Sequence, residues 1–154
     1  MVSTDTIRTD TWIISIPHDW IEKGQTEDGA LYFESSDGSK GIYISTWHIA
    51  DTDVRTSEQV AESFKAVGLR SLQNMEGYSW HTETEEMENL SDSTVSITDA
   101  LAEAKCYRIV EKILSRPPVV VRAAFHDYDC KLYHDSLACF APIIQSLRFY
   151  DGAV

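Results

Sequence analysis

Alternating apolar and polar residues predict strands in the first third of the chain. Residues 12–16 place one Trp and two Ile on the same parity, and Pro17 ends this strand. A second apolar pattern covers 31–33 and is followed by an Asp-Gly turn within 36–39. Residues 41–49 are apolar on both parities, as in a strand that is covered on both faces. We therefore expect three strands before the first helix.

A helix is expected to begin at Ser57. This residue is a suitable N-cap, and Glu58 favours the first turn electrostatically. Apolar residues then follow roughly helical spacing: Val60, Phe64, Val67 and Leu72. Gly68 weakens the helix, so its end is expected between residues 67 and 75.

The hydrophobic pattern is lost after Trp80. Gly77 restarts the chain as a strand that places Tyr78 and Trp80 on one face. Residues 81–93 are mostly Thr, Glu, Ser and Asp, and the acids fall on both parities. This segment is therefore either a strand that projects beyond the core or an exposed loop.

Residues 99–114 fit two patterns, a helical stripe or a strand face. We favour two strands joined by a turn at 116–118, because the Pro-Pro pair breaks the chain and 119–125 predicts a strand. Residues 132–147 predict a final helix, in which Pro142 either makes a kink or starts the last segment. Its expected inward residues are Leu137, Phe140, Ile144 and Leu147.

Four short segments resemble PsbP-like domains. Residues 16–20 resemble the Pro-x-x-Trp start of these domains, 31–35 and 42–45 resemble their second and third strands, and 143–147 resembles their terminal helix. The resemblance implies an α+β fold, with an antiparallel sheet of about six strands flanked by two main helices and used for binding rather than catalysis. This fold group includes photosystem accessory proteins, a Ran-binding factor and small bacterial chaperones for secreted effectors. Fold alone names no partner.

The length of 154 residues favours one globular domain over 1–154, with residues 1–10 as a flexible tail. Hydrophobic residues make up 43% of the chain, which is enough for a core. We expect one core between sheet and helices, formed by Trp12, Ile14, Phe33, Ile44, Phe64, Val121, Phe125, Ile144 and Leu147.

Acidic residues dominate the charge of the chain. The formal net charge is −12, and the eight acids between Ser71 and Ala104 have no Lys or Arg among them. A patch of one sign attracts basic partners and repels nucleic acid and anionic membranes. The alternative is a solvated face that only keeps the protein soluble.

The chain is expected to be cytoplasmic. Its first ten residues are polar and contain no apolar signal core, and no apolar run reaches membrane-spanning length. Its three cysteines, Cys106, Cys130 and Cys139, are odd in number and have no paired spacing, so they predict free thiols.

The strongest pattern for metal is His126-x-x-x-Cys130-x-x-x-His134. Zinc accepts such ligands, but the spacing matches no common finger and the segment is expected to pass from a strand into a helix. Cys130 is also the one cysteine near histidines in sequence, and no nucleophile signature surrounds it. We therefore predict no metal and no cofactor, and keep a small enzyme or metal protein as an alternative.

No catalytic motif accompanies these features. We predict a non-enzymatic cytosolic protein-binding domain, in particular an immunity protein that neutralises a basic toxin or effector. A chaperone or adaptor for a secreted effector, which would use an apolar groove, is the second interpretation. The candidate partner-binding residues are Trp20, Tyr78, Trp80, Glu83, Glu85, Glu86, Glu88 and Asp92.

Overall fold

Seven antiparallel strands form the main sheet of the protein, whose computed structural model describes residues 3–151. Their order is β3-β4-β5-β9-β8-β7-β6. The bounds are β3 Ile21–Gln25, β4 Leu31–Glu34, β5 Lys40–His48, β6 His81–Asn89, β7 Thr94–Ala102, β8 Tyr107–Arg116 and β9 Val119–Asp127. A smaller sheet has the order β1-β2-β10, with β1 Thr4–Arg8, β2 Trp12–Pro17 and β10 Arg148–Phe149.

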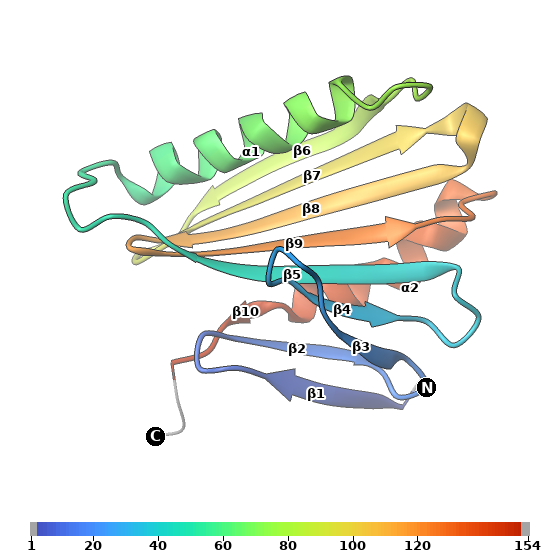
Figure 1. The fold of residues 1–154 in the computed structure, drawn as a ribbon, viewed down its shortest axis with the longest axis horizontal. Coiled ribbons are helices and arrows are strands. Elements are labelled where there is room, and N and C mark those ends of the chain that lie inside the picture. The colour runs from blue at the N-terminus through green and yellow to red at the C-terminus, as the bar shows by residue number, and fades with distance from the viewer. Residues whose placement is uncertain (1–2, 152–154) are drawn as a thin grey trace.

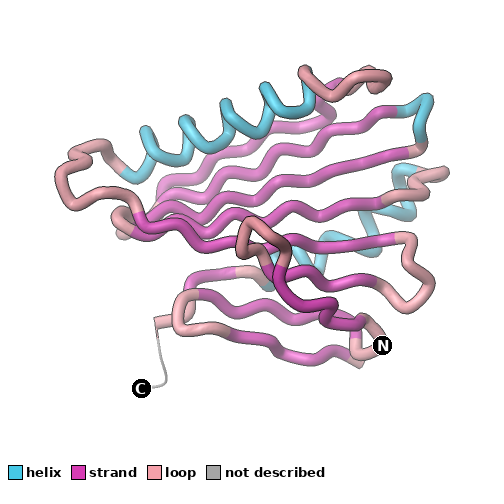
Figure 2. Tube along the Cα trace, viewed as in Figure 1, coloured by secondary structure: helices cyan, strands magenta, loops and turns pink. Residues whose placement is uncertain are grey.

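The two main helices cover opposite faces of the large sheet (Figures 1 and 2). Helix α1 (Ser57–Gln73) lies over β7 and β8, whereas α2 (Tyr133–Ser146) and the small sheet cover the other face. A short 3-10 helix, η1 (Glu103–Lys105), joins β7 to β8. The expected α+β architecture with two flanking helices is confirmed, and the sheet is larger than the six strands predicted.

Successive side chains of a strand point to opposite faces of the sheet, so the core forms two clusters, one on each face. On β8, Val110 and Leu114 point toward α2, whereas Ile113 points toward α1. Eight of the nine predicted core residues belong to the α2 side, where Ile144 is partly buried and the other seven are buried. Phe64 is the exception, because it packs in the smaller cluster under α1. The prediction of one continuous core was therefore wrong at this residue.

Helix α1 begins as predicted, but its cap is one residue earlier. The Thr56 side chain accepts a hydrogen bond from the N–H of Gln59, and the Gln59 side chain accepts one from the N–H of Thr56. This reciprocal pair is a capping box, and it replaces the predicted Ser57 cap. The helix ends at Gln73, inside the predicted range.

Residues 1–10 contain a strand where a flexible tail was expected. The polar segment Thr4–Arg8 forms β1 and pairs in antiparallel register with β2. Strand β2 supplies inward apolar side chains to the main core, and β1 pairs with its backbone. The sequence of residues 4–8 therefore needs no alternating apolar pattern to form a strand. Residues 1–2 of that prediction lie outside the described residues.

Helix α2 is continuous through Pro142, which lies in its last turns. Its buried side chains are Ser136, Phe140 and Ile143, while Leu137 is exposed rather than inward as predicted. Among the described residues, no helix is both long and apolar enough to cross a membrane.

Candidate partner-binding groove

The acidic segment forms an edge of the large sheet. Strand β6 is the last strand in the order and pairs with β7 alone. The pairing shifts register between Thr82 and Thr84, as at a β-bulge. In the described chain the outward N–H and C=O groups of β6 have no second strand, so this edge can accept an added one.

The fold brings basic side chains to several acids of the run. Glu85 pairs with Lys65 of α1 at 2.7 Å, and Asp92 lies 3.3 Å from Nη1 of Arg116. Asp99 is buried and paired with Arg108. These partners lie outside the acidic stretch in sequence, so they neutralise much of what the sequence shows as an unbalanced patch.

Glu86 and Glu88 stay without a basic partner in the described residues and face a groove. The groove has a volume of about 710 Å³ and runs between β6, β7, β8 and α2. The apolar part of its floor is formed by Val95, Ile97, Val110 and Leu114, and the paired or hydrogen-bonded Asp99, Arg108 and Lys112 lie on the same strands. Leu137, Ala141 and Ile144 of α2 form the opposite wall. The result is an apolar channel with an acidic edge strand along one side.

Four cationic side chains line the groove, and the protein itself holds three of them: Lys112, Arg116 and Arg108, the last of which pairs with Asp99. Lys112 Nζ donates to the carbonyl oxygens of Ile144 and Leu147, each at 2.7 Å, at the C-terminal end of α2. Burial lowers the pKa of Lys112 to about 8, so it is charged at neutral pH. Arg116 lies between Asp92 and Asp151 and over the Phe149 ring, and closes one end. The fourth, Arg148, is exposed on β10, and in the described residues no ion pair joins any of the four to Glu86 or Glu88.

The remaining candidate residues lie away from the groove. Tyr78 and Trp80 stack on each other before β6, with ring centroids 6.0 Å apart, and contact Tyr107. Glu83 lies at the bulge, 3.2 Å from His81. Trp20 packs edge-on against Phe140 in the main core. The structure thus brings Glu86, Glu88 and Asp92 together and separates them from the aromatic candidates.

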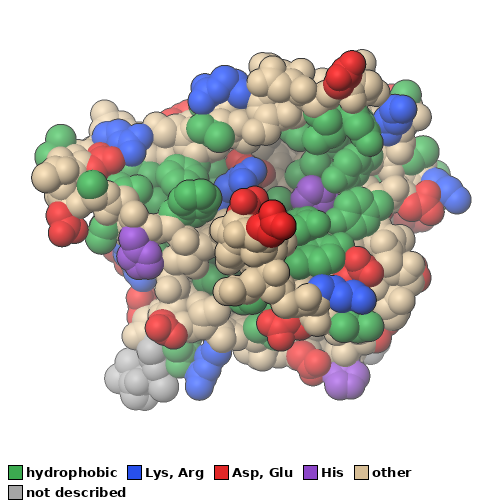
Figure 3. Space-filling model, in the orientation of Figure 1, with side chains coloured by type: hydrophobic (Ala, Val, Ile, Leu, Met, Phe, Trp, Pro, Cys, Tyr) green, Lys and Arg blue, Asp and Glu red, His purple; other side chains and the backbone are tan. Residues whose placement is uncertain are grey.

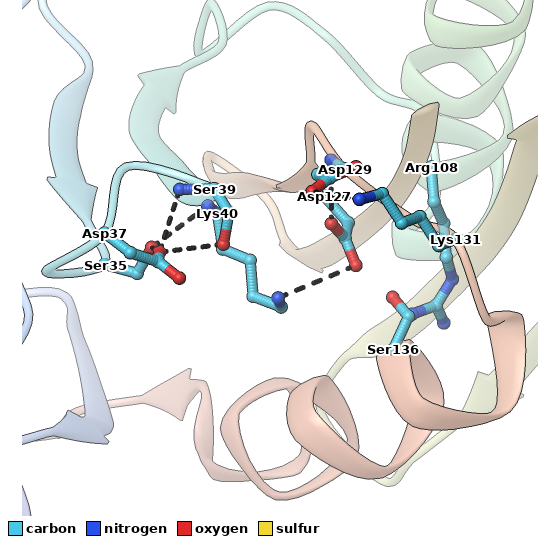
Figure 4. Close-up of polar contacts among 9 residues, drawn as sticks. All are labelled: Ser35, Asp37, Ser39, Lys40, Arg108, Asp127, Asp129, Lys131 and Ser136. Atoms are coloured by element: carbon cyan, nitrogen blue, oxygen red, sulfur yellow. Dashed lines mark hydrogen bonds and ion pairs between the residues drawn. The ribbon is translucent and has the colours of Figure 1, made fainter. Parts of the chain in front are cut away.

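Segment 126–135 does not gather its His and Cys side chains. His126 faces the α1 side of β9, whereas His134 is exposed on α2 across the sheet. Cys130 lies in the intervening loop near Asp127, whose carboxylate is 3.9 Å from Lys40 Nζ (Figure 4). No group of three or more His, Cys, Asp or Glu side chains suited to a metal occurs in the part of the chain that the structure describes. The absence of a bound metal stays a prediction.

Sequence reasoning missed most of the groove. Its floor comes from β7 and β8 and its wall from α2, and only the acidic edge was singled out. No sequence signal marked the wall, because Leu137 fits the inward pattern of the helix and only the structure shows that it is exposed.

Comparison with known proteins supports the fold and assigns no sequence family. No protein-family model and no curated protein match the chain. The solution structure of cyanobacterial PsbP (CyanoP) from Synechocystis sp. PCC 6803 is similar, with a TM-score of 0.67, 14% identity and coverage of 97% of this chain and 94% of that one. A Pseudomonas aeruginosa protein of unknown function, PA94, matches with a TM-score of 0.41, 12% identity and coverage of 88% and 90%. The fold is therefore PsbP-like.

Proposed function

We propose that this protein is a non-enzymatic binding domain that takes an extended, basic segment of a protein partner along β6. The proposal rests on two features that lie side by side. One is the free edge of β6, and the other is an apolar groove whose rim carries carboxylates without a basic partner in the described residues. An added strand supplies backbone hydrogen bonds, and the groove selects side chains.

The spacing of the carboxylates predicts the pattern of the bound segment. Glu86 and Glu88 are two residues apart in a strand, so their side chains point to the same side at a separation of roughly 7 Å. A partner strand in register would place Lys or Arg at alternate positions opposite them. The intervening partner residues would face the α1 side, where Met87 of β6 packs against the core.

As a biological role we propose an immunity protein that neutralises a basic toxin or effector. Toxins that act on nucleic acid or membranes are often basic, and complementary charge speeds their encounter with an acidic partner. The formal net charge of −12 and the acidic rim of the groove support this role.

A second candidate role is a chaperone for a secreted effector, favoured by the apolar floor of the groove. An immunity protein would bind its folded toxin more tightly than any short segment of it. A chaperone would bind an isolated unfolded segment as tightly as the whole effector. Titrations with the folded protein and with its basic segment, once a partner is in hand, separate the two roles.

Binding of a defined peptide tests the groove directly. The probe is a fluorescent peptide of alternating Lys and Val, and the control peptide alternates Ser and Val. The Glu86→Lys/Glu88→Lys variant should bind the Lys peptide about tenfold more weakly at low salt, with a flatter salt dependence. Glu22→Lys/Glu62→Lys makes the same charge change at exposed positions on β3 and α1, and should bind nearly as the wild type does.

Equal weakening by both double variants would attribute binding to net charge and would reject the groove. Binding that is unaffected by Glu86→Lys/Glu88→Lys would mean that these acids do not contact the peptide. They would then only keep the sheet edge soluble, which is a common role of charge on edge strands.

A further inference from the structure

A second cleft lies on the opposite face of the large sheet, between α1 and the turn that joins β3 to β4. Two hollows of about 180 and 570 Å³ meet there, since Arg122, Ala124 and His126 of β9 line both of them. Hydrophobic side chains gather on both sides of this hollow in the space-filling view (Figure 3). The larger volume lies within the range of small-molecule sites, roughly 300–1,000 Å³.

An ion pair on the floor of this cleft leaves donors open to it. Arg122 Nε donates to Oε2 of Glu111 at 2.6 Å. Glu111 lies against α1 at Gly68, where a methyl group would come within 2.6 Å of Oε1. This bond uses Nε alone, and in the described residues no acceptor pairs with Nη1 or Nη2 of Arg122. The outer edge of the guanidinium is therefore available to an acceptor in the cleft.

His126 adds a third donor beside Arg122. The Tyr107 hydroxyl lies 2.6 Å from Nδ1 of His126, and a phenol donates more strongly than it accepts. Burial lowers the pKa of His126 to about 4, so the ring is neutral and carries one proton. Because Nδ1 accepts from Tyr107, that proton lies on Nε2. In the described residues Nε2 has no hydrogen-bond partner, and it is not excluded from solvent. His126 lines both hollows of the cleft, so this nitrogen is available to a ligand there.

The walls beside these donors are apolar and exposed. Trp47 of β5 is 48% exposed and Val67 of α1 is 52% exposed, and both line the larger hollow. Trp47 is fixed by an edge-on contact with Phe64, and Tyr43 continues the aromatic wall toward His126. A planar apolar group placed here would remove this surface from water.

We propose that this cleft binds a small aromatic monocarboxylate. The carboxylate accepts from Nη1 and Nη2 of Arg122 and from Nε2–H of His126, and the aromatic ring lies against Trp47 and Val67. The site shares no lining residue with the groove beside β6, so it stands whether or not that groove binds a protein.

The charges of the cleft select a single negative charge. Glu111 already offsets Arg122, so every negative charge on the ligand adds to the site, and a dianion such as a phosphate monoester costs more than a monoanion. Asp28 on the rim adds repulsion. A ligand without a carboxylate would leave these partly buried donors without a charged acceptor. A monocarboxylate satisfies the donors at the smallest electrostatic cost.

Titration with two indole compounds tests the site. Indole-3-acetate carries the ring and the charge, and indole-3-acetamide carries the same ring without the charge. Calorimetry on the full chain should show saturable binding of indole-3-acetate, with amide chemical-shift changes on β5 and β9. Binding of indole-3-acetamide should be weaker by about tenfold, as expected for the loss of a charge-assisted hydrogen bond.

Variants assign the contacts. Arg122→Gln combined with Glu111→Gln removes both charges of the pair without leaving an unpaired carboxylate, and should lower the affinity for indole-3-acetate about tenfold. Trp47→Ala changes an exposed side chain and should weaken both compounds. Arg148→Gln, at an exposed position on β10, is the charge control and should bind as the wild type does.

Three results would overturn the assignment. One is equal affinity for the acid and the amide. Another is wild-type affinity in the double variant or in Trp47→Ala. The last is the absence of saturable indole-3-acetate binding up to about 5 mM, a concentration that detects even weak affinity.

Discussion

His126 shows how one residue acquires a property that its sequence neighbours do not reveal. It lies among Tyr43, Tyr107 and Tyr128, which come from three strands or loops. Burial among these rings lowers its pKa to about 4, with a smaller contribution from the charge of Arg122. In the sequence the same histidine stands out only as a member of a metal-like spacing.

This pKa predicts a pH-dependent stability. Between pH about 4 and 6.5 the unfolded chain binds more protons at His126 than the folded chain does. The free energy of unfolding should therefore fall as the pH drops through this range, by up to about 3 kcal/mol from this residue. Urea unfolding of the wild type and of His126→Gln from pH 4 to 7 measures the difference.

The two stability curves should converge as the pH falls. Glu111, whose pKa is raised by burial, titrates with the opposite sign, but it is present in both proteins and cancels in the comparison. Parallel curves would mean that His126 has no depressed pKa.

Gly68 is a residue whose role is visible only in the fold. In the sequence it looks like a weak point of the helix. In the structure its missing side chain lets the Glu111 carboxylate lie against α1, since a methyl group would come within 2.6 Å of Oε1. Gly68→Ala should destabilise the protein by about 1–3 kcal/mol, although Ala favours helices.

Thermal or urea denaturation checks this prediction, with Ser71→Ala at an exposed position of the same helix as the matched control. The control should gain a few tenths of a kcal/mol from helix propensity. A Gly68→Ala protein as stable as the control would show that Glu111 moves aside at no cost.

At the scale of elements, local pattern predicted the outline of the fold and long-range pairing decided the rest. Strand β2 and helix α1 have clear periods, and both were predicted from them. Strand β7 was not, because Thr94, Ser96 and Thr98 face α1 and are buried although polar. Their sequence therefore lacks an alternating apolar face.

The partners of the acidic residues were equally invisible in the sequence. The pairing of Asp99 with Arg108 follows from the register of β7 on β8, and that of Glu85 with Lys65 from the placement of α1. The sequence predicted that acids would gather on one segment, either a projecting strand or an exposed loop. It could not predict which of them would keep an unpaired charge.

The Asp99–Arg108 pair joins β7, β8 and α2. Two parallel hydrogen bonds of 2.8 and 2.9 Å link the side chains, and Arg108 also donates to Ser136 of α2. Arg108→Met leaves a buried carboxylate without its cation and should cost roughly 3–5 kcal/mol. Chemical denaturation measures this loss.

The double variant Asp99→Leu/Arg108→Met should recover most of that stability, because it leaves no uncompensated charge behind. A double variant no more stable than Arg108→Met alone would show that the pair itself, rather than the cost of an unpaired charge, stabilises the fold.

At the scale of the whole molecule, the two faces of one sheet carry different sites. The face under α2 has an acidic edge and an apolar groove, and the face under α1 has a cleft with aromatic walls and a guanidinium. The net charge of −12 acts on both, since it attracts basic proteins over a distance and disfavours multiply charged anions.

Amide hydrogen exchange with the Lys-Val peptide tests the central claim, strand addition at β6, most directly. The peptide should protect the outward amides of β6 and leave the amides of β3, the opposite edge strand, unchanged. Methyl shifts should appear at Ile97 and Leu114 on the groove floor. Protection at β3, or binding without protection at β6, would contradict the account.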